Sequence, residues 1–121
     1  MQLKVITKDG DIDPSQVKIG DLLLCEDGVF HPVLSIVVIA SPGYYLRLSN
    51  NISFNIHHRI RIKTESGFKY PELWDNVLID KNLTPMVTSV KEQVDVRFFY
   101  DILIQGNLVS PEKIIFRFGD S

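Results

Sequence analysis

The sequence contains a single cysteine, Cys25, so the chain cannot form an intramolecular disulfide. It also lacks the paired cysteines at short spacing that hold structural zinc. Two of its three histidines, His57 and His58, are adjacent, and neighbouring side chains of a strand point to opposite faces. The pair is therefore poorly placed to bind one ion, and we expect no metal site and no cofactor.

Long apolar runs and a strong net charge are also absent. The longest apolar run covers residues 36–40, which is far too short to cross a bilayer, and the N-terminal residues do not form the apolar core of a signal peptide. The net charge of −2 gives no long-range attraction to nucleic acid. These absences predict a soluble protein made in the cytoplasm, and they also allow incorporation into a virus particle.

The length and composition are those of an ordinary globular domain. The chain has 121 residues, of which 45% are hydrophobic and 23% charged, and it is long enough to bury one core without a metal or a disulfide. No segment rich in Gly, Ser or Pro divides it. We therefore expect a single domain over residues 1–121.

Short apolar stretches alternate with turn sequences along the whole chain, and no stretch shows an apolar period of helical length. The turn sequences lie at residues 8–10, 26–28, 41–43, 50–51 and 64–67. The pattern predicts an all-β fold. We expect one helical turn opened by Pro14 and another at residues 71–74, and strands at residues 3–7, 22–25, 33–40, 44–49, 51–63, 68–70, 77–79, 86–90, 94–105 and 114–118.

The most informative of these strands is the one at residues 51–63. If it is regular, His58 shares a face with the isoleucines on either side of it, whereas His57 points to the opposite face. We therefore expect His58 to be buried and His57 to be exposed to solvent. A buried imidazole needs a hydrogen-bond partner, and the nearest upstream polar side chain, Asn55, reaches it only if the strand begins with a bend or bulge.

Three segments occur in an order that is found in a known family. They are residues 17–23 (Val-Lys-Ile-Gly-Asp-Leu-Leu), residues 55–59 (Asn-Ile-His-His-Arg) and residues 100–107 (Tyr-Asp-Ile-Leu-Ile-Gln-Gly-Asn). Together they resemble the Hint domain, the fold shared by inteins and the autoprocessing domain of Hedgehog proteins. The resemblance implies a compact β fold of many short strands with long curved hairpins. It places His58 in the position of the family's histidine, which protonates the leaving amine as a general acid, and Asn55 in the position of its threonine.

The sequence departs from the family at the positions that carry its chemistry. A Cys or Ser at the first position of the family's domain attacks the preceding carbonyl, whereas this chain starts with Met1 and enters the pattern at Leu3. Residues 118–121 (Phe-Gly-Asp-Ser) stand where the family has a terminal His-Asn pair, and no histidine follows Asn107. We therefore expect a stand-alone, degenerate Hint-like domain rather than an enzyme. Its role would be that of a structural or protein-interaction module in a larger assembly, for which a bacteriophage particle is our proposed setting.

Two other functions stay open from the sequence. The first is a residual autoprocessing domain that uses His58 when it is joined to or docked on another chain. The second is an unrelated small β-barrel that binds nucleic acid, which would bind with a steep salt dependence. Neither function requires a small-molecule substrate.

Four residues are candidates for contacts with other protein chains. Arg59, Arg61 and Lys63 would form a basic stripe on one face of the strand at residues 51–63, and the simplest interpretation of that stripe is a solvated face. Nucleic acid is a poor partner for the stripe because the net charge is negative. Phe99 would lie on the opposite face of its strand from Phe98 and Tyr100, covered either by another part of the domain or by a partner chain.

Overall fold

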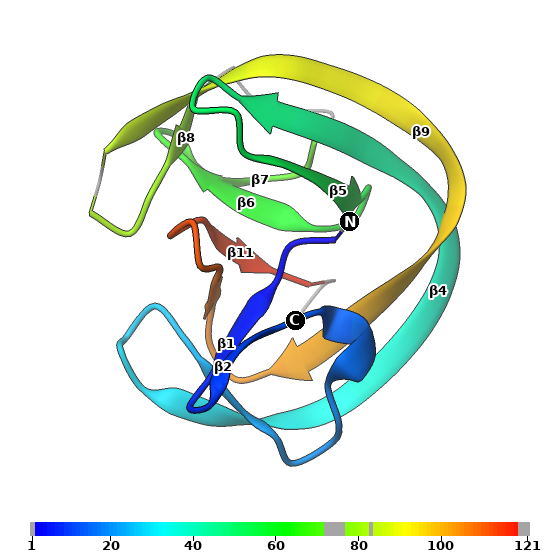
Figure 1. Ribbon diagram of the computed structural model, residues 1–121, viewed down its shortest axis with the longest axis vertical. Coiled ribbons are helices and arrows are strands. Elements are labelled where there is room, and N and C mark those ends of the chain that lie inside the picture. The colour runs from blue at the N-terminus through cyan, green and yellow to red at the C-terminus, as the bar shows by residue number, and fades with distance from the viewer. Residues whose placement is uncertain (1, 72–76, 83, 119–121) are drawn as a thin grey trace.

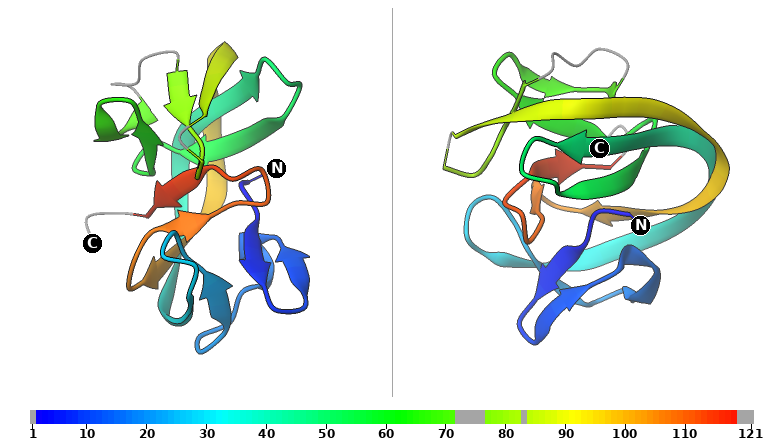
Figure 2. Two further views of the ribbon diagram at one scale, coloured as in Figure 1. Left: turned by 90° about the vertical axis from the view of Figure 1, so that its left-hand side faces the viewer. Right: turned by 45° about the horizontal axis from the view of Figure 1, so that its top comes forward.

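The computed structural model describes residues 2–71, 77–82 and 84–118. Its largest feature is a ribbon of two long antiparallel strands, β4 (Phe30–Leu48) and β9 (Pro85–Ile104), which pair over most of their length. The ribbon curves around the molecule like the letter C, and the shorter strands gather on its concave side (Figures 1 and 2). The all-β prediction is confirmed, and so are the long curved hairpins.

The remaining elements are short. In chain order they are β1 (Val5–Thr7), β2 (Gly10–Ile12), the 3-10 helix η1 (Pro14–Gln16), β3 (Leu22–Leu24), β5 (Ser53–His57), β6 (Arg61–Thr64), β7 (Gly67–Lys69), β8 (Val77–Ile79), β10 (Leu108–Val109) and β11 (Ile115–Arg117). One sheet runs in the order β10-β11-β6-β8-β9-β4-β3, with β5 added to β4 and β7 added to β6, and β1 pairs with β2 in a separate hairpin. Within the described part of the chain, no helix is long and apolar enough to cross a membrane. The helical turn expected at residues 71–74 falls mostly outside the described residues.

The turn predicted at residues 41–43 is wrong, because β4 passes straight through it. Ser41 pairs with Arg97 and Gly43 pairs with Val94, so two residues of β9 lie opposite Pro42. This extra residue is a β-bulge, and a bulge accommodates a proline that has no N–H to donate to the ladder. The local turn signal at Pro42 is therefore overridden by pairing with a distant strand.

The gap predicted between the strands at 86–90 and 94–105 is wrong for the same reason. Lys91, Glu92 and Gln93 pair with consecutive residues of β4, so β9 is continuous. Three register shifts interrupt the pairing of β4 with β9, and each shift increases the local twist. The ribbon therefore curves enough to enclose a core instead of lying flat.

The core inside the ribbon consists of apolar side chains from almost every strand. Leu23 of β3, Leu46 of β4, Ile56 of β5, Ile62 of β6 and Phe116 of β11 are all completely or almost completely buried. Each such side chain contributes about 1.5–3 kcal/mol by leaving water. The short strands are thus held in place mainly by the apolar side chains that they bury against the ribbon.

The strand predicted at residues 51–63 is divided in two. β5 ends at His57 and β6 begins at Arg61, and the N–H of Ile60 donates to the carbonyl of His57 across the intervening turn, at 3.1 Å. The alternation of faces therefore does not continue from β5 into β6.

Three strands approach one another most closely at Gly43. This residue of β4 pairs with His57 of β5 on one side and with Val94 of β9 on the other. A Cβ atom built there would lie 2.2 Å from the carbonyl oxygen of Ile56 and 2.8 Å from the ring of Phe99. Both distances are too short, and one neighbour is backbone, so only glycine fits.

We predict that Gly43→Ala destabilises the fold by about 1–3 kcal/mol, because β5 or the Phe99 ring must move to admit the methyl group. Urea unfolding followed by circular dichroism measures the change. Val37→Ala, at a half-exposed position of the same strand, is the matched control and is expected to cost under about 1 kcal/mol. Equal unfolding midpoints for the two variants would contradict the packing at Gly43.

Candidate functional site

The side chains around Gly43 bring ionisable and aromatic residues into contact. We call His57, His58, Phe99, Asp101 and Ser41 the His57 cluster. The ring centroids of His57 and His58 are 4.6 Å apart, edge to face, and the His57 and Phe99 centroids are 5.4 Å apart. His57 Nδ1 lies 3.6 Å from Asp101 Oδ1. The cluster lies where β4, β5 and β9 meet, so its members come from segments far apart in the sequence.

The predicted roles of the two histidines are reversed in the structure. His57 is the buried residue, with 1% of its surface exposed, and His58 is exposed in the turn that follows β5. The expectation that His58 is buried among aliphatic side chains is therefore wrong. The reason is the turn, which lifts His58 out of the strand so that Ile60 and Ile62 enter the core without it.

Phe99 is buried by its own domain. Its ring packs against His57 and against the backbone at Gly43, and only 2% of its surface is exposed. Of the two alternatives for covering Phe99, the structure therefore supports another part of the domain. The neighbouring Phe98 is the exposed ring, with 72% of its surface open to solvent.

His58 is hydrogen-bonded within the domain through one ring nitrogen. Nδ1 lies 2.7 Å from the Ser41 hydroxyl and 3.2 Å from the Pro42 carbonyl oxygen, and the Ser41 hydroxyl donates to that same carbonyl. A carbonyl oxygen only accepts, so Nδ1 carries the proton and donates. Although Ser41 and His58 touch, this is not an activated nucleophile, because the ring nitrogen facing the hydroxyl is not a base.

His57 and the partly buried Asp101 contain buried polar atoms that have no hydrogen-bond partner among the described residues. Both ring nitrogens of His57 and Oδ1 of Asp101 have none among the described residues, and 3.6 Å between the two side chains is longer than a hydrogen bond. Burial, with smaller contributions from His58 and Arg59, lowers the pKa of His57 to about 4. Burial raises the pKa of Asp101 to about 6, against the opposing effect of His58 and Arg59. At pH 7 the His57 imidazole is therefore neutral.

Asn55 and His58 do not line the same cavity. Asn55 forms a parallel bridge with Gln2 and borders a cavity of about 310 Å³. His58 borders another cavity, of about 270 Å³, whose other lining residues are Pro42, Gly43, Tyr44, Gln93 and Val94. The structure therefore separates the two residues that stand in the family's histidine and threonine positions.

The predicted basic stripe is not one open surface. Arg59 is exposed in the turn after β5, but the Arg61 guanidinium lies 5.7 Å from the centre of the Tyr70 ring. Lys63 donates to Glu26 at 2.7 Å in a partly buried ion pair. Of the three residues, only Arg59 is exposed to solvent as the sequence predicted.

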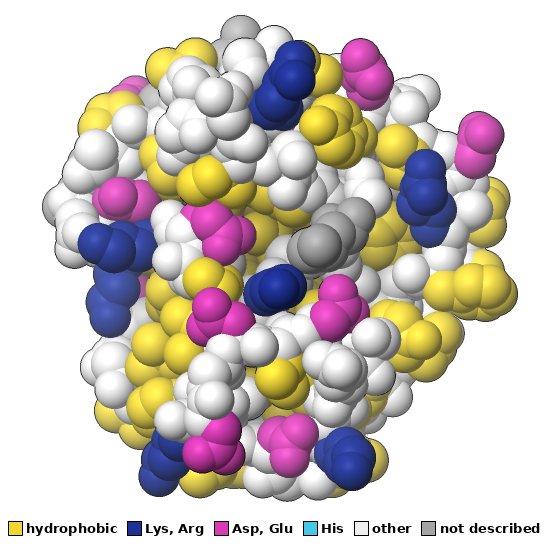
Figure 3. Space-filling model, in the orientation of Figure 1, with side chains coloured by type: hydrophobic (Ala, Val, Ile, Leu, Met, Phe, Trp, Pro, Cys, Tyr) yellow, Lys and Arg dark blue, Asp and Glu magenta, His cyan; other side chains and the backbone are white. Residues whose placement is uncertain are grey.

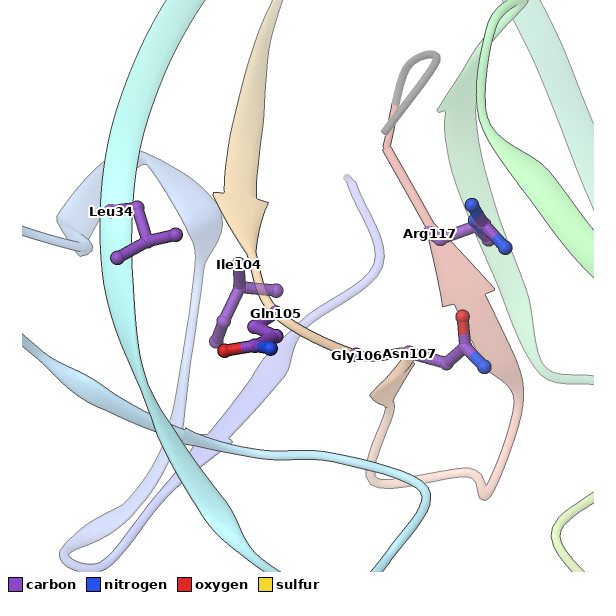
Figure 4. A pocket seen from close by; sticks show the side chains of 6 residues that line it. All are labelled: Leu34, Ile104, Gln105, Gly106, Asn107 and Arg117. Carbon is purple, nitrogen blue, oxygen red and sulfur yellow. The ribbon is translucent and has the colours of Figure 1, made fainter.

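A cavity of about 510 Å³ lies where β9 ends, and none of its lining residues is a nucleophile (Figure 4). Its lining residues are Leu34, Ile104, Gln105, Gly106, Asn107 and Arg117. The only cysteine, Cys25, lies next to Gly106 of this cavity but is buried, and its pKa is raised to about 11, mainly by burial and further by Asp27. A thiol with that pKa is protonated and inert at neutral pH.

Sequence reasoning missed His57 and Asp101 as the buried titratable pair. The signal for Asp101 was present, because it interrupts the apolar run at residues 98–104. For His57 no local signal existed, because its burial depends on where the turn begins. Among residues 2–71, 77–82 and 84–118, no three His, Cys, Asp or Glu side chains are placed to hold a metal ion.

Comparison with solved structures identifies the fold. The gp41-1 intein superimposes with a TM-score of 0.83 at 20% identity, covering 96% of this chain and 94% of that chain. The MchDnaB-1 intein gives 0.81 at 15% identity over 95% of both chains. The bacterial intein-like domain from Clostridium thermocellum gives 0.77 at 12% identity, over 98% of this chain and 99% of that one. Neither a family model nor a curated protein sequence matches. The chain thus has an intein-like Hint fold.

The two shifted pKa values predict opposing effects of pH on stability. His57 resists protonation in the folded state, so its contribution to stability is lost as the pH falls from about 6.5 to about 4. Asp101 holds its proton more tightly in the folded state, so its contribution rises as the pH falls from about 6 to about 4. In the native protein the two effects largely cancel.

We therefore predict that Asp101→Asn makes stability more sensitive to acid. Between pH 7 and pH 5 the uncompensated His57 is expected to cost the variant about 2 kcal/mol, against less than about 1 kcal/mol for the native protein. Urea unfolding at both pH values measures this. Asp95→Asn, at an exposed position of the same strand, is the control and should follow the native protein. If the stability of Asp101→Asn changes with pH as that of the native protein does, the opposing pKa shifts of His57 and Asp101 are refuted.

Proposed function

We propose that this intein-like Hint domain is a protein-interaction module that does not cleave or splice peptide bonds. The observation that supports the proposal most directly is the hydrogen bonding of His58. Ser41 and Pro42 of the same domain occupy Nδ1 of His58, so only Nε2 is left to pass a proton to a leaving amine, and no Ser, Thr or Cys lines the cavity beside the ring. The neighbouring His57 is neutral at pH 7, so it does not replace His58 as an acid.

The residues that line the two cavities also argue against acyl transfer. No Ser, Thr or Cys lines the cavity beside His58. Asn55, in the position of the family's threonine, lies in a different cavity, and Leu108 follows the Gly-Asn pair at the end of β9 with no histidine. Nucleophilic catalysis requires a base that takes the proton of the nucleophile, and the hydroxyl within reach of His58, that of Ser41, donates its proton to the Pro42 carbonyl instead.

An interaction role is supported by the apolar side chains on the ribbon. Val38 of β4 and Val96 and Phe98 of β9 are all more than half exposed, near the middle of the ribbon. Figure 3 shows apolar side chains projecting along the right-hand edge of the molecule, over the bend of the ribbon. Exposed apolar patches of this kind are typical of contact surfaces between proteins.

The partners that we propose are other protein chains of a larger assembly, with a bacteriophage particle as one setting. Nucleic acid is disfavoured because Lys63 is neutralised by Glu26 and Arg61 lies against Tyr70, which leaves little of the basic stripe for phosphates. The second candidate is residual autoprocessing through His58. Its support is the location of that ring beside a cavity of about 270 Å³.

One experiment separates the two candidates. We predict that the protein, extended by flanking residues at both ends, keeps its intact mass over several days at pH 7, with or without added thiol. Electrospray mass spectrometry reads this directly. Cleavage that disappears in His58→Ala but persists in His31→Ala, the matched histidine outside the cluster, would establish autoprocessing and overturn the proposal.

A further inference from the structure

The outer edge of β9 is unpaired along much of its length. β4 pairs with one edge of β9, and β8 pairs with the other edge only at residues 85–87. Residues 95–98 of β9 are all exposed, and no described strand pairs with their outer edge. An unpaired edge presents backbone N–H and C=O groups that can add another strand.

Gln2 already occupies one position on that edge. Its side-chain amide donates to the carbonyl of Tyr100 at 3.1 Å, and its side-chain oxygen accepts from the Tyr100 N–H at 3.3 Å. These are the two hydrogen bonds that a residue of an added strand would make with Tyr100. The carboxamide of Gln2 therefore takes the place of an added strand at Tyr100, so a partner strand has to pair with the edge beyond this residue.

The next position on the same edge is Phe98. Hydrogen-bonding directions alternate along an antiparallel pair, so the N–H and C=O of Phe98 point the same way as those of Tyr100. Phe98 and Tyr100 pair in regular register with Ala40 and Val38, so no bulge disturbs this alternation. No described group bonds to the Phe98 backbone.

The side chains at this position differ between the two faces of the strand. On one face is the Phe98 ring, 72% exposed, beside the exposed Val96. On the other is Arg97, which is exposed and has no ion pair among the described residues. Arg97 and Phe98 both line the cavity of about 310 Å³ that Gln2 and Asn55 also border.

We propose that the edge of β9 at Phe98 binds an extended segment of a partner protein in which apolar and acidic residues alternate. The segment adds as a strand, and its backbone bonds to the N–H and C=O of Phe98. An apolar side chain packs on the Phe98 ring, and the next residue directs a carboxylate to Arg97. Asp13 lines the same cavity and repels a carboxylate, so the acidic group of the partner must lie close to Arg97. This inference rests on the proposed interaction role and names the chemistry of the partner.

The test uses blocked peptides that alternate valine with glutamate, valine with lysine, or N-methylated valine with glutamate. We expect the valine–glutamate peptide to bind and to shift the amide resonance of Phe98, and N-methylation to abolish binding. Arg97→Ala is expected to weaken binding about tenfold, and Arg97→Glu to reverse the preference towards the lysine peptide. Arg47→Ala, at an exposed arginine of β4, is the matched control and should bind as the native protein does.

Each result decides the inference. No binding, equal binding of the glutamate and lysine peptides, or binding that tolerates N-methylation would overturn it. Such a result, together with an unchanged mass of the extended protein, leaves the proposed function standing. Cleavage of the extended protein would overturn the proposed function on its own. Arg97 and Phe98 are exposed, so loss of the fold is not expected in their variants, and circular dichroism verifies this.

Discussion

The antiparallel pairing of β4 with β9 is the interaction on which the rest of the structure depends. These two strands join residues that are 40 to 71 positions apart in the sequence, and the other strands of the main sheet are attached to them directly or through a neighbouring strand. The pairing is strong enough to carry β4 through a proline and to continue β9 through three polar residues in a row. Because the register shifts curve the ribbon, a single pair of strands provides much of the wall around the core.

The pairing of β4 with β9 also brings polar side chains together inside the domain. Phe99 and Asp101 of β9 come to lie beside His57 of β5 because Gly43 lets the strands approach closely. Burying an imidazole and a carboxylate without hydrogen bonds costs free energy, and their opposed pKa shifts are the consequence of that burial. The cluster therefore resembles a catalytic centre in composition, yet His57 and Asp101 are too far apart for a hydrogen bond and Nδ1 of His58 is occupied within the domain.

This distinction supports an interaction role over a chemical one. A fold shared with inteins at 10–20% identity indicates architecture alone, and activity must be argued from the site. Nδ1 of His58 bonds within its own domain, whereas the ribbon displays a large exposed ring, Phe98, on an edge that no described strand covers. The features that face solvent are suited to contact with another protein.

The sequence by itself determined the all-β class and the resemblance to the Hint domain, because alternation, turn residues and short motifs are local properties of the chain. It also located most of the short strands. It did not predict that the segment at residues 41–43 is a strand, that His57 rather than His58 is buried, or that Phe98 rather than Phe99 is exposed. Each of these depends on contacts between residues distant in sequence: the partner of Pro42 across a bulge, the turn closed by Ile60, and the ring that fills the space beside Gly43. Local propensity is a weak preference of about 1 kcal/mol or less per residue, and tertiary pairing and burial outweigh it.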